Sequence, residues 1–144
     1  MKKALVLIFI LGISFNSYSQ GFQSHINLEA AIEAASSQDQ DILMVFSGSD
    51  WCRPCKQFKK LILDDVKFQN YCDESLTILY LDFPSKKKNK LSEEQKIHNE
   101  ELAAKYNASG TFPKLILFSN NLEKLKEIPY QGEAVNAFIK KLEL

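Results

Sequence analysis

The sequence predicts an α/β domain in which a central mixed β-sheet of about four strands is flanked by helices on both faces. Short apolar runs alternate with longer amphipathic segments of helical period along most of the chain. The last two apolar runs are separated only by a short polar turn, which is typical of an antiparallel pair. A chain of 144 residues, 45% of them hydrophobic and 25% charged, is suited to one compact domain.

The first helix is expected at residues 27–37, where apolar residues recur on one helical face and Asn27 can cap the N-terminus. The apolar run 42–48 then predicts a strand that is buried on both faces. This strand leads directly to Trp51 and Cys52.

The second helix is expected from residue 54 to about residue 66. Phe58, Leu61 and Ile62 recur at helical spacing in this segment. Its first residue is Pro54, which is tolerated in a first helical turn because the missing N–H would have no partner there. Cys52 is therefore expected at a helix N-terminus.

The apolar run 76–83 predicts a second buried strand, and an exposed loop, "PSKKKNK", follows at 84–90. Ser92 and Gln95 can form a capping box for a third helix at 92–106. The inward face of this helix is expected to hold Ile97, Leu102 and Tyr106.

A third strand is expected at 112–118, and residues 124–130 can return antiparallel as a fourth. The final helix is expected after Gly132. Its inward face would hold Val135, Phe138, Ile139 and Leu142.

The N-terminal segment has the pattern of a secretory signal peptide. A positively charged start precedes an apolar run of about ten residues, which is too short to span a bilayer because a spanning helix needs roughly 20. We predict a signal peptide at 1–19, cleaved after Ser19, and an exported domain at 20–144 that is periplasmic or secreted. No stable membrane insertion is expected after cleavage.

Charge gives no argument for nucleic acid as a partner. The formal net charge is zero, and basic residues do not interleave with aromatic ones in a stripe. The lysine-rich run 86–90 is expected to be a solvated loop, with recruitment of an acidic partner as the alternative.

The chain contains three cysteines, of which Cys52 and Cys55 are spaced as C-x-x-C. This pair has three meanings to be weighed: a redox couple, half of a metal site, or a structural disulfide. A metal site would need further ligands, and Cys72, His25 and His98 stand at no recognisable ligand spacing, so no metal is expected, although copper handling stays an alternative. A structural disulfide across so short a loop would stabilise little.

A cysteine at a helix N-terminus favours the thiolate, which is the nucleophile in disulfide exchange. The location of Cys52 therefore favours a redox couple, with Cys55 one turn later on the same helix. Cys72 is expected to be a buried or half-buried free thiol; a regulatory or intermolecular disulfide is its alternative.

The stretch "FSGSDWCRPCK", residues 46–56, resembles the active-site segment of the thioredoxin superfamily, and "TFP" at 111–113 resembles the cis-proline loop of that family. The resemblance covers nearly all of residues 20–144 and implies a thioredoxin-like fold, although the first strand of the family is weak or missing here. It is closest to exported bacterial thioredoxin-like proteins.

The resemblance also implies the roles of the site residues. Cys52 would attack a partner disulfide, and Cys55 would resolve the mixed disulfide. Trp51 would cover the site, and a cis Pro113 would present the backbone of Phe112 to a substrate peptide. The residues between the two cysteines are Arg53 and Pro54.

Some positions depart from the family. Where thioredoxins have a buried Asp and a nearby Lys that help to move protons, this chain has Val45 or Phe46, and Tyr80. A water, Asp50 or the substrate would then take the proton of Cys55. Arg53 and Lys114 add positive charge, which predicts a more oxidising couple than cytosolic thioredoxin.

These observations predict an exported thiol–disulfide oxidoreductase that acts on protein thiols and disulfides, exchanges electrons with an unidentified redox partner, and needs no cofactor beyond the Cys52–Cys55 pair. One alternative is a thioredoxin-fold binding module, a chaperone or metal carrier without turnover. The other is a dedicated reductant in cytochrome c maturation.

Overall fold

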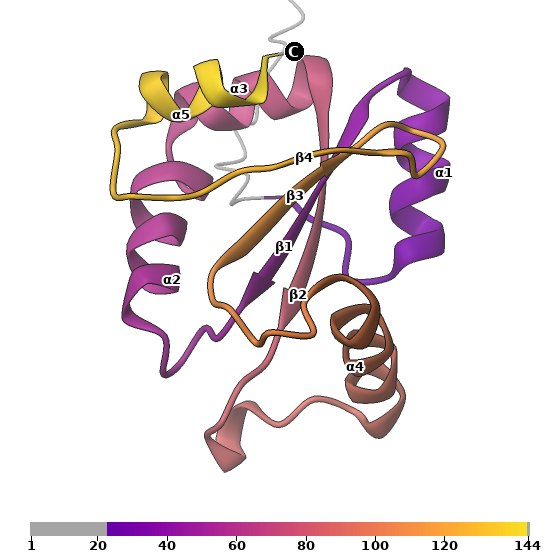
Figure 1. Ribbon diagram of the computed structural model, residues 1–144, viewed down its shortest axis with the longest axis vertical. Coiled ribbons are helices and arrows are strands. Elements are labelled where there is room, and N and C mark those ends of the chain that lie inside the picture. Colours follow the sequence, from indigo (N-terminus) through magenta and orange to yellow (C-terminus); the bar gives the residue numbers. More distant parts are fainter. Residues whose placement is uncertain (1–22, 144) are drawn as a thin grey trace, which may run out of the picture.

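The computed structural model describes residues 23–143, so the predicted signal peptide at 1–19 lies outside the described residues. A four-stranded mixed sheet stands between two groups of helices (Figure 1). The elements are α1 (Leu28–Gln38), β1 (Asp41–Ser47), α2 (Arg53–Phe58), the π-helical turn η1 (Lys59–Leu63), α3 (Val66–Ser75), β2 (Leu76–Asp82), the 3-10 turn η2 (Lys87–Asn89), α4 (Glu93–Tyr106), β3 (Lys114–Phe118), β4 (Lys124–Glu127) and α5 (Val135–Leu142).

The strand order is β2-β1-β3-β4. β1 and β2 are parallel, with Asp41 opposite Leu76 and Ser47 opposite Asp82. β3 is antiparallel to both β1 and β4. The predicted α/β class with a central mixed sheet and helices on both faces is therefore confirmed.

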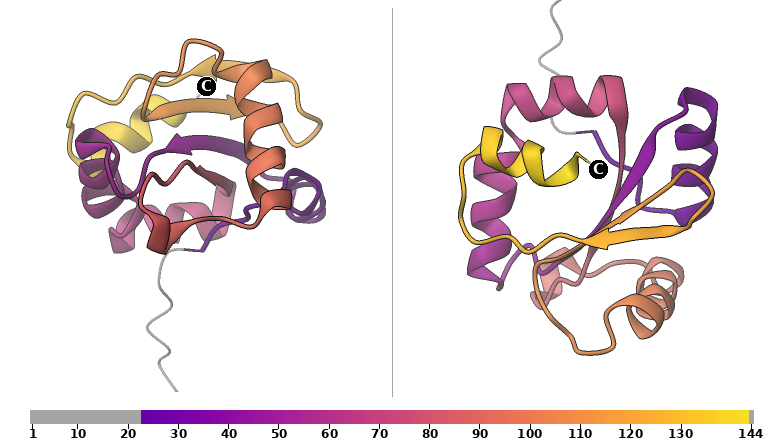
Figure 2. Two further views of the ribbon diagram at one scale, coloured as in Figure 1. Left: turned by 90° about the horizontal axis from the view of Figure 1, so that it is seen from below. Right: turned by 45° about the horizontal axis from the view of Figure 1, so that its top comes forward.

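The two faces of the sheet bury separate hydrophobic cores, because side chains of successive strand residues point to opposite faces. One core lies under α2, η1, α3 and α5 and includes Val45, Phe58 and Phe138. The other lies under α1 and α4 and includes Phe46 and Leu102. Figure 2 shows the two groups of helices on opposite sides of the sheet.

The predicted helix at 54–66 is wrong in its extent and in its inward face. The α-helical part ends at Phe58, and the chain continues through η1. Leu61 is exposed because the wider π-turn rotates it away from the core that holds Ile62. A separate helix, α3, occupies residues for which no helix was predicted.

Helix α4 matches the predicted 92–106, and the Ser92 side chain accepts a hydrogen bond from the Gln95 N–H, as a capping residue does. Its predicted inward face is wrong at Ile97, which is half exposed, and right at Leu102. Asn99 is buried instead, since its side-chain amide donates to the Asp82 carbonyl at the end of β2.

Within residues 23–143, an isolated bridge stands in place of the first strand of the family. His25 lies parallel to Leu79 at the outer edge of β2, donating its N–H to the Ile78 carbonyl and accepting from the Tyr80 N–H, both at 2.8 Å. The expectation that this strand is weak is thus confirmed. Within residues 23–143, no helix has the length and apolarity needed to cross a membrane.

Candidate active site

Cys52 and Cys55 form a disulfide at the first turn of α2, with their Cα atoms 5.3 Å apart. Cys52 is the N-cap residue, and its sulfur accepts a hydrogen bond from the Cys55 N–H at 3.2 Å. Both cysteines are almost fully buried, whereas Arg53 and Pro54 between them are exposed. The helix therefore directs backbone N–H groups at Cys52, as the sequence predicted.

The peptide bond between Phe112 and Pro113 is cis, as the resemblance implied. It immediately precedes β3, whose first residue, Lys114, pairs with Phe46 in β1. Since β1 continues into the turn that carries Cys52, the start of β3 and the disulfide lie at the same end of the sheet (Figure 1).

Trp51 joins the cysteine turn to two other segments. Its indole N–H donates to the Phe83 carbonyl at 2.7 Å, and its ring meets the ring of Phe112 edge to face, with centroids 5.3 Å apart. Phe83 and Phe112 are also in contact. Trp51 is still 48% exposed, so this aromatic cluster presents an apolar surface beside the disulfide.

Gly48, a residue that sequence analysis did not single out, is required for this arrangement of Trp51. A Cβ atom at Gly48 would overlap the indole of Trp51. The Gly48 carbonyl also accepts from the N–H groups of Trp51 and Cys52 and so closes the turn. A glycine three residues before the tryptophan was the available signal.

The surroundings of Asp50 make it a poor base for Cys55. Its carboxylate accepts hydrogen bonds from the N–H groups of Ser85 and Lys86 and from the Asn89 side chain, each at 2.9 Å. These bonds, that of the Ser85 N–H above all, hold the pKa of Asp50 far below its usual range. A carboxylate so weakly basic, and bound to another loop, is a poor acceptor for a thiol proton.

Comparison with known proteins agrees with this geometry. The family model of the thioredoxin-like domain matches residues 28–142. The chain belongs to the thioredoxin-like domain family. A disulfide bond reductase, DsbH, from Chlamydia pneumoniae is 30% identical over 112 residues, which cover 78% of this chain and 66% of that relative.

Solved structures of thioredoxin-like proteins have the same fold. A DsbH oxidoreductase superposes with a TM-score of 0.76 at 25% sequence identity, covering 99% of this chain and 92% of that chain. A thioredoxin from Thermus thermophilus has a TM-score of 0.61 at 14% identity, covering 84% and 85%. The predicted family and fold are confirmed, and the relatives are of the predicted class, thiol–disulfide oxidoreductases.

Among thioredoxin-like proteins, this chain lacks a buried acid at the expected positions. Val45 and Phe46 are both fully buried apolar residues. The Tyr80 hydroxyl instead donates to the Ser47 hydroxyl at 2.8 Å, and burial is the main cause that raises the pKa of Tyr80. This pair keeps its protons near neutral pH, so it does not replace an ionised Asp.

The two added positive charges differ in their surroundings. The Lys114 ammonium lies 3.0 Å from a carboxylate oxygen of Glu127, and the Lys114 side chain is only 17% exposed. The other oxygen of Glu127 pairs with Lys124 at 2.7 Å, so this carboxylate offsets only part of the charge that Lys114 was expected to bring. Arg53 is exposed and forms no salt bridge within residues 23–143, so its charge is not offset in this way.

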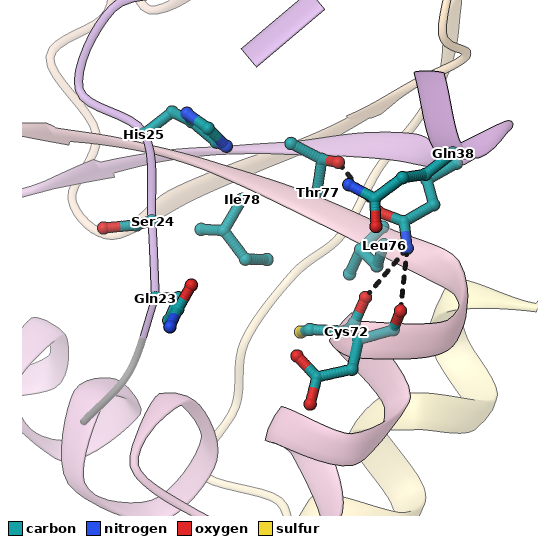
Figure 3. A pocket seen from close by; sticks show the side chains of 10 residues that line it. Gln23, Ser24, His25, Gln38, Cys72, Leu76, Thr77 and Ile78 are labelled. Atoms are coloured by element: carbon teal, nitrogen blue, oxygen red, sulfur yellow. Dashed lines mark hydrogen bonds between the residues drawn. The ribbon is translucent and has the colours of Figure 1, made fainter. Parts of the chain in front are cut away.

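Cys72 is a half-buried free thiol, as predicted. It lines a pocket of about 420 Å³ at the start of β2 (Figure 3). The disulfide follows the other end of β1, so the two lie at opposite ends of the sheet. The Gln40 side chain donates to the carbonyls of Cys72 and Asp73 in the last turn of α3. Burial, with a smaller contribution from Asp73, raises the pKa of Cys72 to about 12.

The two histidines have structural positions. His25 forms the edge bridge to β2, and the Nε2 atom of His98 accepts from the Leu28 N–H at 3.1 Å, at the start of α1. Across residues 23–143, no group of three or more His, Cys, Asp or Glu side chains could hold a metal ion. That the protein needs neither a metal nor a cofactor stays a prediction.

Proposed function

We propose that this protein is a thiol–disulfide oxidoreductase of the cell envelope, which exchanges disulfides with protein substrates through Cys52 and Cys55. The observation that carries the proposal is the location of their disulfide, at the first turn of α2 and at the same end of the sheet as the cis Phe112–Pro113 bond. The reductase activity in the name of the Chlamydia pneumoniae relative supports the reducing direction.

In the reducing direction, the Cys52 thiolate attacks one sulfur of a substrate disulfide. A mixed disulfide forms, and the other substrate sulfur leaves as a thiolate. The Cys55 sulfur, after losing its proton, attacks the Cys52 sulfur and releases the second substrate thiolate. The substrate gains two electrons and the cysteine pair loses two, so a separate redox partner must reduce the pair again.

Cys52 suits the role of attacking group because it lies at the N-terminal end of α2. Its sulfur accepts the Cys55 N–H, and a thiolate would be stabilised by the same donor and by the positive end of the helix dipole. Cys55 follows the exposed Arg53–Pro54 step, is almost fully buried and is bonded to Cys52 in the oxidised form, which suits it to resolve the mixed disulfide. Since no Asp or Glu is fully buried among residues 23–143, we assign its proton to the substrate thiolate that leaves in the first step.

The surrounding residues would bind the substrate chain. The backbone of Phe112, before the cis Pro113, can pair with an extended substrate segment, as a strand edge does. The exposed ring of Trp51 offers apolar contact next to it. Location in the periplasm or outside the cell is supported by the signal pattern at 1–19. These compartments are oxidising, so the disulfides on which such a pair acts form and persist there.

The decisive experiment compares insulin reduction by dithiothreitol in the presence of three proteins: one with both cysteines of the pair, called wild type here, and the variants Cys52→Ser and Cys55→Ser. All three should carry Cys72→Ser, so that any trapped thiol adduct comes from the pair. We expect Cys52→Ser to fall to the uncatalysed rate, a loss of at least about a hundredfold, because the nucleophile is gone.

Cys55→Ser should accumulate mixed disulfides with substrate proteins, seen as bands that dithiothreitol removes from a non-reducing gel. A binding module without turnover would give a different outcome: the wild type would not accelerate insulin reduction, and Cys52→Ser would keep its affinity for partners. Failure of the wild type to accelerate insulin reduction would overturn the proposed function.

A further inference from the structure

The lysine-rich loop 84–90 is fixed to the active-site turn. Asp50, two residues before Cys52, accepts hydrogen bonds from Ser85, Lys86 and Asn89. A loop that is merely solvated needs no such attachment. Figure 1 shows this loop at the same end of the molecule as the start of α2.

Next to this loop lies a pocket of about 300 Å³, which extends to α4. Phe83, Pro84 and Leu91 supply its apolar lining, and Lys86, Lys87 and Lys90 lie around it. The Phe83 carbonyl also accepts the indole N–H of Trp51. Phe83, which lines the pocket and contacts Phe112, therefore joins the pocket to the aromatic cluster beside the disulfide.

The charge of this pocket is positive. Lys86, Lys87 and Lys90 are exposed and form no salt bridge among residues 23–143. The fourth lysine at the pocket, Lys96, is compensated by Glu93 and Glu100.

One more acid, Asp82, lines the pocket, but its carboxylate is turned towards backbone and hydroxyl donors. It accepts from the Ser49 N–H at 2.8 Å, from the Ser49 hydroxyl at 2.6 Å and from the Phe83 N–H at 3.0 Å. Within residues 23–143, the side-chain ammonium groups of the three loop lysines thus form no salt bridge with a carboxylate, although the Lys86 backbone N–H donates to Asp50.

We infer that Lys86, Lys87 and Lys90 dock an acidic segment of the protein whose disulfide meets Cys52. This inference rests on the proposed function and names the chemistry of the partner. A substrate chain bound at Phe112 and Trp51 can continue over Phe83 into the pocket, where its carboxylates meet the lysines and an apolar side chain meets Leu91. Exposed charges of this kind act mainly on the association rate.

Two synthetic peptides test the inference. Both contain the same intramolecular disulfide, flanked by four Glu in one peptide and by four Gln in the other. Trp51 is the sole tryptophan of the chain, so its fluorescence can follow oxidation of the pre-reduced protein in stopped flow. We expect a rate constant roughly tenfold higher for the Glu peptide at low ionic strength, and a preference below about twofold in 0.5 M NaCl.

Charge-reversed and neutral variants locate the effect. K86E/K87E/K90E should lose or invert the preference, and K86Q/K87Q/K90Q should reduce it to near unity. The matched control K60E/K67E/K140E changes three exposed lysines of η1, α3 and α5 and should keep the preference. Equal preference in the wild type and in both loop variants would overturn the inference.

A neutral disulfide, bis(2-hydroxyethyl) disulfide, separates this inference from the proposed function, because all variants should react with it at the wild-type rate. If none reacts, the proposed function fails, and binding of the two peptides to the oxidised protein by fluorescence anisotropy then decides the docking site alone. Loss of binding to phosphatidylglycerol vesicles in K86E/K87E/K90E, with the peptide preference kept, would assign the loop to a membrane surface and overturn the inference.

Discussion

At the level of single residues, the turn between β1 and α2 gives neighbouring side chains different tasks. The Cys52 sulfur caps the helix, while the Asp50 carboxylate binds a loop some 35 positions further along the chain. The helical pattern that begins at Pro54 was sufficient to predict that Cys52 lies at the helix N-terminus. The task of Asp50 was not predictable, because hydrogen bonds to distant backbone N–H groups leave no periodic pattern in the sequence.

Cys72 gives the prediction that belongs to this scale. In the oxidised protein it is the sole thiol, and its pKa is raised from 9.0 to about 12 by burial. Three pKa units reduce the thiolate fraction at pH 8 by roughly a thousandfold, so iodoacetamide should modify the native protein up to that much more slowly than the urea-unfolded one. Mass spectrometry measures both rates; similar rates would contradict the burial of the thiol.

At the level of elements, the predictions succeeded where apolar residues follow one period and failed where they do not. The three longer strands, β1, β2 and β3, are continuous apolar runs, and their places along the chain were predicted correctly. Helix α3 was missed because Phe68 is its only buried residue, and β2 follows it at once with no glycine or proline between them. The cis-proline loop was found only through the resemblance, since Pro113 alone is also typical of an ordinary strand start.

The attachment of the lysine loop to the active-site turn predicts a dependence on pH. Because the pKa of Asp50 is lowered in the folded protein, its contribution to stability is fully present above the unfolded pKa of about 3.8 and is lost as the pH falls below it. Asp50→Asn should therefore lower the free energy of unfolding at pH 7, and the difference from wild type should shrink below about pH 4. Urea unfolding at several pH values measures it, with Asp73→Asn on α3 as control.

Trypsin gives an independent readout of the same change, because the loop contains four lysines between residues 86 and 90. Without the carboxylate, the loop should open more often and be cut several-fold faster than in the wild type. Equal cleavage of the two proteins, together with a difference in stability that does not change with pH, would show that Asp50 does not hold the loop.

For the whole molecule, the parallel register of β1 and β2 separates two regions. Ser47 and Asp82 end their strands beside the disulfide, whereas Asp41 and Leu76 begin them near Cys72. Six residues of strand correspond to roughly 20 Å, at about 3.3 Å per residue. Cys72 is therefore too distant to exchange with Cys52 in the same molecule, and redox chemistry is confined to one end of the sheet.

The balance between the reduced and oxidised molecules gives the last prediction. A cation near Cys52 stabilises the thiolate, which exists only in the reduced form, so it raises the reduction potential. We expect a potential above the roughly −270 mV of thioredoxin. Arg53→Glu should lower it by roughly 6–20 mV, since an exposed charge is worth about 0.3–1 kcal/mol and 30 mV corresponds to about 1.4 kcal/mol.

Glu127→Gln should shift the potential in the opposite direction, because it removes the carboxylate that offsets the half-buried Lys114 beside the cis-proline. Titration against glutathione, followed by the fluorescence of Trp51, measures all three proteins. Opposite shifts require that the two cations act on the same thiolate through their charge. Shifts of one sign in both variants, or a wild-type potential at or below that of thioredoxin, would exclude charge at these positions as the cause.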